Sequence, residues 1–396
     1  MNGGTKMYPL APVSSAILCR WCHRSSINPE KFSPVEKMVK QQAEHLNLQQ
    51  IETFWKKTLD QYEGYLPDLK QKGFMQLLME DGGLSPSGMF KGILKFFFHE
   101  ILMNGKLLSS IIIITVFAML LESMQNAFEK NTVSVVAYAI AYLVLMVLAM
   151  NSFHVAITYA KGAIQGMSDF MLAMIPLVLA LLASMGNLAS AAMFHPIIVF
   201  MINISGFLIS TIIFPLLFLS AMLSIVSLFS ERYKVTQLAI LLRNVAMGVM
   251  GSFLTIFLAI LSIQGATSAM ADGVTIRTAK YITGNFVPVV GRMFTDAADT
   301  VVSASVLVKN AVGLAGVFIL LLLCAFPAMK ILILALIYNF SSAVLQPLGN
   351  SPIIKALGTI GKSLLYVFAA LATVGLMFFL AITIIIAAGN ISLMVR

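Results

Sequence analysis

Charged residues are scarce in this chain of 396 residues, in which Asp, Glu, Lys and Arg together make up only 11%. An ordinary soluble domain carries about 25% charged residues. Apolar residues reach 59%, and the mean hydropathy is +0.90. These values exclude an ordinary soluble protein and predict an integral membrane protein. The net charge of +9 does not indicate nucleic-acid binding, because the basic residues among the apolar runs fall mainly in short loops, as expected for residues that fix a membrane topology.

Cysteine is also rare, with three residues in the whole chain. Cys324 lies within an apolar run, where a small packing residue is the simplest interpretation. Cys19 and Cys22 form a C-x-x-C-H sequence with His23, which matches a haem-attachment pattern. Haem attachment requires export, and the short, proline-interrupted apolar stretch before Cys19 makes a poor signal-peptide core. We therefore predict no haem at this pattern.

Recognisable catalytic motifs are absent from the sequence. It has no phosphate-binding GxxxxGK[ST] loop, no HExxH zinc motif and no GxSxG nucleophile turn. The alternating ten-residue segments of a membrane β-barrel are absent as well. We predict that the protein is not an enzyme and has no catalytic residues, no bound metal and no cofactor. Any transport would then draw its energy from a partner protein or an ion gradient.

Long hydrophobic runs begin at about residue 105, most of them near the roughly 20 residues that a membrane-spanning helix needs. The sequence therefore predicts an all-α, polytopic membrane protein with about eight hydrophobic segments and a helical N-terminal region. The predicted segments are residues 105–124, 134–158, 170–194, 196–229, 244–266, 311–329, 331–347 and 364–388. The fourth run is too long for one ordinary span, so either Pro215 kinks it or it forms a hairpin of two short helices.

The runs and the stretches between them divide the chain into five predicted parts. In order, these are a poorly structured segment (1–45), an amphipathic helical region (46–104), a first group of spans (105–266), an amphipathic, re-entrant or pore-lining segment (267–310) and a second group of spans (311–396). In the second part, Ile51, Trp55, Leu59 and Tyr62 recur at helical spacing, which predicts a small helical cap that packs on its neighbours.

Loop charges predict the orientation of the chain. If residues 196–229 cross the membrane once, Lys161 lies on the same side as the basic residues Arg232, Lys234 and Arg243. The positive-inside rule assigns that side to the cytoplasm. The 267–310 segment is then outside and the C-terminus inside. If residues 196–229 form a hairpin, the N-terminal region moves outside.

Polar residues of the 267–310 segment gather on one side of a predicted helix that starts at about Gly291. At about 100° per residue the polar stripe consists of Arg292, Asp296, Asp299, Ser303 and Asn310. The residues that fall opposite are Met293, Phe294, Ala297, Val301, Ala304 and Val308. Arg292 and Asp296 are four residues apart and can form a pair. We predict that the stripe lines a pathway and that four residues shape its entry, namely Gly284, Pro288, Gly291 and Gly313.

Three interpretations of this helix remain open. It is an amphipathic helix at the membrane surface with its polar face in water, a re-entrant or pore-lining element, or a soluble helix that docks on a partner. Charged groups at membrane depth are found where they face a bundle interior or an aqueous path. The pathway interpretation therefore depends on the depth of the stripe, which the sequence does not fix.

Several motifs of the chain resemble the signature of the stage III sporulation protein AE family, polytopic membrane proteins of endospore-forming bacteria. The matching motifs are residues 286–291 (FVPVVG), 296, 299–300, 309–313 (KNAVG), 100–108 and 122–129. The resemblance implies a membrane subunit of a channel-like export or feeding complex that links the mother cell to the forespore. It implies as partners the other membrane proteins of the same sporulation operon and a forespore membrane protein, with self-association left open.

The same resemblance implies a location in the mother-cell-derived membrane around the forespore. Two other functions fit the polytopic pattern. One is a stand-alone permease for a small solute, and the other is a scaffold of the same assembly with no pathway of its own. Neighbouring genes for an ATPase and several small membrane proteins would favour the assembly over the permease. The scaffold predicts that the polar stripe has no effect on passage.

Overall fold

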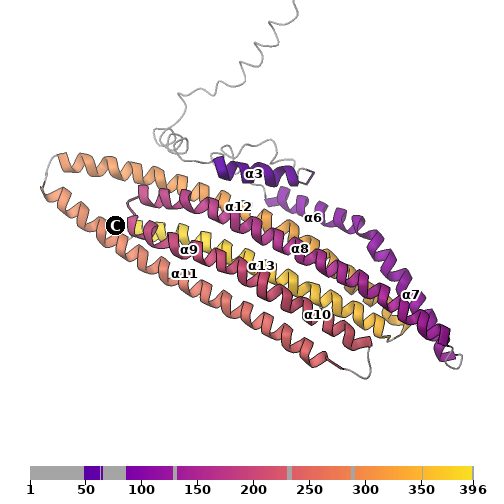
Figure 1. Cartoon of the computed structure of the whole chain (residues 1–396). Coiled ribbons are helices and arrows are strands. Elements are labelled where there is room, and N and C mark those ends of the chain that lie inside the picture. Colours follow the sequence, from indigo (N-terminus) through magenta and orange to yellow (C-terminus); the bar gives the residue numbers. More distant parts are fainter. Residues whose placement is uncertain are drawn as a thin grey trace, which may run out of the picture.

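Long α-helices account for almost all of the structure, a computed structural model that describes residues 49–62, 64–65, 86–127, 132–229, 234–286, 290–349 and 351–394. The predicted segment 1–45 lies outside these residues. No strand occurs within them, and the chain is a polytopic helical membrane protein. The elements are α3 (Gln49–Gln61), α6 (Pro86–Met103), α7 (Gly105–Ala127), α8 (Thr132–Ser184), α9 (Leu188–Leu208), η2 (Ile209–Ile213), α10 (Phe214–Phe229), α11 (Thr236–Phe286), α12 (Val290–Leu345), η3 (Gln346–Leu348) and α13 (Pro352–Met394) (Figure 1).

Six continuous helical segments among the described residues are long and apolar enough to cross a membrane, and they carry the eight predicted runs. The separation of 134–158 from 170–194 is wrong, because α8 continues from the first of these runs into the second and ends at Ser184. The rest of the second run covers the α8–α9 turn and the start of α9 at Leu188. The separation of 311–329 from 331–347 is also wrong, because α12 continues through Lys330. A charged residue lowers the local hydropathy but keeps its backbone N–H, so the helix does not end there. The five-part division stays a prediction, although α11 and α12 continue across residues 266 and 310.

The long fourth run is one rod and not a hairpin. Helices α9 and α10 are joined by the π-helical turn η2, in which the N–H of Phe214 donates to the oxygen of Ile209. Pro215 follows directly and has no N–H to offer the carbonyl of Thr211. A π-turn beside a proline absorbs this missing hydrogen bond and lets the helix continue.

Tight connections place the helix ends at two ends of the bundle. Helix α8 ends at Ser184 and is followed by Gly186, whose φ of 85° suits glycine, and the N–H of Asn187 donates to the oxygen of Leu182 at 3.0 Å. Because α12 is one helix, the C-terminal end of α13 returns to the end of the bundle where α8 meets α9 (Figure 1). The prediction that the C-terminus and the 267–310 segment face opposite sides is therefore wrong for this bundle, since the number of crossings between them is even.

The basic residues from which the orientation was predicted do not all lie in loops. Lys161 lies in the middle of α8 and not in a loop, so it does not report the topology. The guanidinium of Arg243 on α11 lies 5.2 Å from the centre of the Tyr366 ring on α13. Lys355 and Lys362, earlier on α13, therefore lie toward the same end of the bundle as Arg243. That end carries the basic residues that the positive-inside rule assigns to the cytoplasm.

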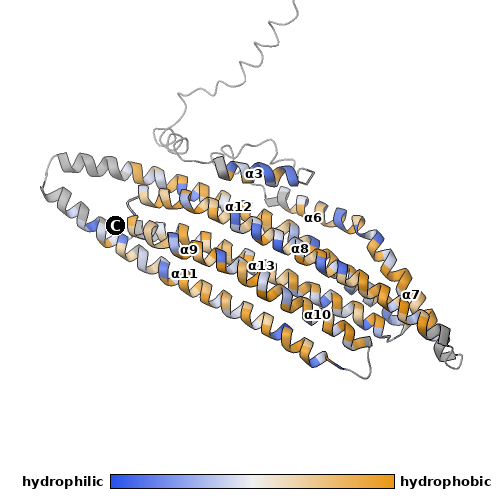
Figure 2. Cartoon of the chain, in the orientation of Figure 1, coloured by the Kyte–Doolittle hydropathy of each residue, from blue (hydrophilic) through white to orange (hydrophobic). Residues whose placement is uncertain are grey.

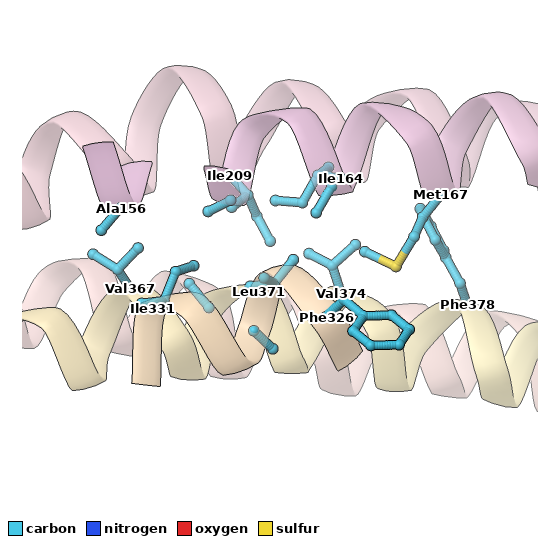
Figure 3. Packing of buried hydrophobic residues seen from close by; sticks show 14 of the residues in the cluster. Ala156, Ile164, Met167, Ile209, Phe326, Ile331, Val367, Leu371, Val374 and Phe378 are labelled. Carbon is cyan, nitrogen blue, oxygen red and sulfur yellow. The ribbon is translucent and has the colours of Figure 1, made fainter. Parts of the chain in front are cut away.

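The core lies where α8, α12 and α13 meet, with η2 closing one side. Figure 3 shows Ile164 and Met167 of α8 opposite Leu371 and Val374 of α13. All four side chains are at most 1% exposed. Hydropathy colouring shows mostly apolar residues along the coloured parts of the long helices and more hydrophilic residues on α3 (Figure 2).

Helix α3 is the predicted cap, and its four apolar positions are all buried. The ring of Tyr62 stacks on Phe326 of α12 with centroids 3.8 Å apart, and Trp55 lies against Phe318. Phe96 of α6 packs edge-on against Phe326 and joins α6 to the same cluster. Burial raises the pKa of the Tyr62 hydroxyl to about 12, with a smaller contribution from the Glu100 carboxylate, so this hydroxyl is neutral at physiological pH.

Candidate functional site

The two faces predicted for the first part of α12 agree with the structure at four of the five predicted positions that it describes, and Val301 on the predicted apolar face is exposed. Ser303 and Asn310 are exposed on the bundle, whereas Ala304 and Val308 are buried. Three further stripe residues belong to the backbone of α12, namely Arg292, Asp296 and Asp299. Their side chains, and so the predicted pair of Arg292 and Asp296, lie outside what the structure describes. The prediction that the stripe lines a pathway therefore stays a prediction.

The four shaping residues fall in different places. Gly284 belongs to the last turn and a half of α11 and Gly291 to the first turn of α12, whereas Pro288 lies outside the described residues. Gly313 is buried in the contact between α12 and α13. A Cβ added at Gly313 would overlap the side chain of Ile386. Close contact of two helices through glycine is typical of membrane bundles, where backbones approach over small residues.

Lys309 is buried, although its neighbour Asn310 is exposed. Lys309 Nζ donates to the backbone oxygen of Ile386 at 3.0 Å and to Oδ1 of Asn390 at 2.7 Å. Both acceptors lie near the C-terminal end of α13, so the lysine ties the first half of α12 to that end. Ionisable groups inside membrane bundles are rare and are held by such partners.

Asp272 of α11 stabilises the start of another helix. Its Oδ1 accepts from the N–H of Ala189 at 3.0 Å, and its Oδ2 accepts from the N–H of Ser190 at 3.1 Å. These N–H groups belong to the first turn of α9, which has no helical acceptors for them. A carboxylate at this position also interacts favourably with the positive end of the helix dipole. A buried residue 83 positions away therefore does the work that a capping side chain usually does locally.

Lys309 and the start of α9 meet through Gly389. A Cβ added at Gly389 would lie 2.6 Å from Lys309 Nζ and 3.7 Å from Nδ2 of Asn187. We call Asn187, Asp272, Lys309 and Asn390 the polar end cluster. It joins four helical regions, namely the α8–α9 turn, α11, α12 and the end of α13. Within the described residues no salt bridge links Lys309 to Asp272. Neutral oxygens contact the Lys309 ammonium, and backbone N–H groups contact the Asp272 carboxylate.

The sequence analysis did not assign a role to Lys309 or Asp272. For Lys309 a signal existed in the sequence, because it is the one charged residue between positions 300 and 329, and a charge within an apolar run marks a group that needs partners. Asp272 carried no such signal, because its partners are distant in sequence. In the part of the chain that the structure describes, no three His, Cys, Asp or Glu side chains could hold a metal ion together.

Comparison with known proteins identifies the family. The family model described as "Stage III sporulation protein AE (spore_III_AE)" matches residues 69–389, which include the polar end cluster apart from Asn390. The chain belongs to this family. A protein of Bacillus subtilis (strain 168) named "Stage III sporulation protein AE" is 55% identical over 361 residues, covering 91% of this chain and 90% of that protein. No solved structure matches. The family supports a sporulation role in a membrane, and its description names no enzymatic activity.

Proposed function

We propose that this chain is a membrane subunit of a channel-like complex between mother cell and forespore, to which it contributes a conduit or export component. The complex would lie in the mother-cell-derived membrane around the forespore. Its other members would be membrane proteins of the same operon and a forespore membrane protein, with further copies of this chain as candidates. Family membership supports the sporulation process, and the shape of the apolar surface supports the assembly.

The observation that carries the proposal is an apolar row on α11 that is too long for one bilayer. Leu238, Ile256 and Val274 are 48%, 53% and 66% exposed, and their 18-residue spacing puts them on one helix face. At about 1.5 Å per residue the row spans about 54 Å, whereas the hydrocarbon core is about 30 Å thick. A tilt of about 56° would be needed to fit the row, beyond the usual 0–40°.

The lipid of a single bilayer therefore cannot contact the whole row, and part of it must be buried against something else. In a multi-subunit complex that part is buried against another protein. A stand-alone permease has no such partner. This favours the assembly over the permease. The polar stripe of α12 supplies the hydrophilic surface that a conduit needs, because Ser303 and Asn310 are exposed.

Photo-crosslinking along the row tests the assembly. With a photoreactive residue at Leu238, Ile256 or Val274 in sporulating cells, we expect protein adducts at one or both ends and lipid adducts at the middle position. The same residue at Phe257, which is 1% exposed, is the control and should give neither. Lipid adducts at all three exposed positions, with no protein adduct, would contradict the assembly and favour the permease.

Replacement of the polar stripe tests the pathway. With Ser303→Leu and Asn310→Leu together, we expect heat-resistant spores to fall by at least about tenfold, because an apolar surface repels the water that a conduit holds. Partner proteins should still copurify. The control pair Ser303→Thr and Asn310→Gln keeps polarity and should leave spore yield within about twofold. An unchanged spore yield in the leucine variant would favour the scaffold.

A further inference from the structure

A cavity of about 290 Å³ lies between the cap helix α3 and the helices α8 and α12. This volume is far above the 10–15 Å³ that a single water needs. Two other cavities are about 10 Å³ each and are lined mainly by apolar side chains. The cavity under α3 has no part in the function proposed above, because the polar stripe and the polar end cluster lie elsewhere on the chain.

Two ammonium groups line this cavity from different helices. Lys57 comes from α3 and Lys330 from the middle of α12. Lys330 Nζ lies 4.8 Å from the centre of the Tyr159 ring, which orients it by a cation–π contact. No carboxylate is among the lining residues, and the described residues include no salt bridge to either lysine. The cavity is therefore positively charged.

The rest of the lining combines apolar and hydrogen-bonding groups. Apolar surface comes from Phe54, Ala163, Leu323 and Pro327. Because Pro327 has no N–H, the carbonyl of Leu323 lacks its usual helical donor four residues on. Hydrogen-bonding side chains come from Thr58, Gln61 and Thr158. A lining of this kind suits a ligand that has a negative charge, hydroxyl groups and an apolar part.

The position of the cavity selects the ligand. Helix α3 buries its apolar face on the bundle and exposes a polar face with Lys56, Lys57 and Asp60, which requires water. The same helix lies beside α8 and α12, which are apolar enough to cross a membrane (Figure 1). The cavity between them therefore lies at the boundary of water and lipid, which is the level of the lipid headgroups. Lysines at that level attract anionic lipids. We propose that the cavity under α3 binds the phosphate group of an anionic phospholipid, with Lys57 and Lys330 at the phosphate and the apolar lining at the start of the acyl chains.

Lipid retention by the purified full chain in detergent, counted by native mass spectrometry, tests the proposal. We expect about tenfold more phosphatidylglycerol than phosphatidylcholine to stay bound, and this preference should fall to within about twofold when Lys57→Gln and Lys330→Gln are combined. The matched control is Lys355→Gln with Lys362→Gln, which removes the same charge from exposed positions on α13 and should keep the preference. Equal retention of both lipids, or an unchanged preference in the cavity variant, would overturn the proposal.

A second variant tests whether lipid binding needs the volume of the cavity as well as its charge, at a position where misfolding is not expected. A Cβ added at Gly162 has nothing within 4 Å, so Gly162→Leu should fold normally and fill the cavity that this residue lines. We expect it to lower phosphatidylglycerol retention with both lysines intact, and undiminished retention would overturn the site.

Millimolar inorganic phosphate identifies the source of the anion. Thermal stabilisation by phosphate alone, lost in the lysine variant and not reproduced by phosphatidylglycerol, would assign the cavity to a soluble anion and overturn the lipid.

Discussion

Replacement of Gly313 by leucine is expected to prevent accumulation of the folded protein. A Cβ at this position already overlaps the side chain of Ile386 on α13, and the leucine adds three further carbon atoms. Overpacking of this kind costs about 1–3 kcal/mol and occasionally more. Here the cost should be at the upper end, because Ile386 also accepts the hydrogen bond of Lys309. If α12 and α13 move apart at Gly313, that buried ammonium loses an acceptor as well.

Membrane abundance and the midpoint of thermal unfolding in detergent measure this effect. Gly248→Leu and Gly251→Leu on α11 are matched controls, because a Cβ at either position has nothing within 4 Å. They should accumulate like the unmodified chain, since glycine in a helix interior is not favoured by propensity. If Gly313→Leu accumulated as well as these controls, the close contact of α12 and α13 at this point would be wrong.

Replacement of Asp272 by alanine is the second substitution with a large expected effect. It removes the acceptor of two N–H groups at the start of α9, of which that of Ser190 is buried and that of Ala189 is partly buried. Leaving a buried donor unsatisfied costs about 1–3 kcal/mol, so we expect a loss of about 2–4 kcal/mol in the free energy of unfolding. The free energy of unfolding of Asp272→Asn should lie between those of the unmodified chain and Asp272→Ala, because its amide oxygen can still accept one of the two hydrogen bonds.

Thermal unfolding in detergent and limited proteolysis near Gly186 measure this loss. The control is Asp169→Ala on α8, whose carboxylate is exposed and accepts from Gln165. A surface change of this kind should stay within about 0.5 kcal/mol. We expect earlier cleavage at the α8–α9 turn only in the Asp272 variants. Equal unfolding midpoints for Asp272→Ala and Asp169→Ala would show that the carboxylate does not hold the start of α9.

Predictions from local periodicity succeeded where one helix decides the outcome. The cap helix was predicted from Ile51, Trp55, Leu59 and Tyr62, and all four are buried. On α12, Ser303 and Asn310 are exposed and Ala304 and Val308 are buried as predicted, because a helix repeats every 3.6 residues whatever it packs against. Val301, predicted on the apolar face, is exposed and does not follow the pattern. The boundaries of spans failed at Lys161 and Lys330, where hydropathy falls but backbone hydrogen bonding continues.

The polar end cluster was beyond the reach of the same reasoning. Asp272 and the N–H groups it binds are 83 and 82 residues apart, and Lys309 and Asn390 are 81 apart. No periodicity connects residues at such distances. The cavity under α3 is similar, because it combines Lys57, Tyr159 and Lys330 from three helices.

The sequence alone determined the composition of this protein, its membrane character, its helical build and the polar and apolar faces of individual helices, because hydropathy and periodicity are properties of the local chain. The tertiary structure decided which helices continue through charged residues, at which end of the bundle the C-terminus lies, and which distant groups pair. The physical reason is that a buried charge is stable only when polar groups contact it, and the packing of the helices decides which groups are near. In this bundle the partners of Asp272 and Lys309 come from α9 and α13.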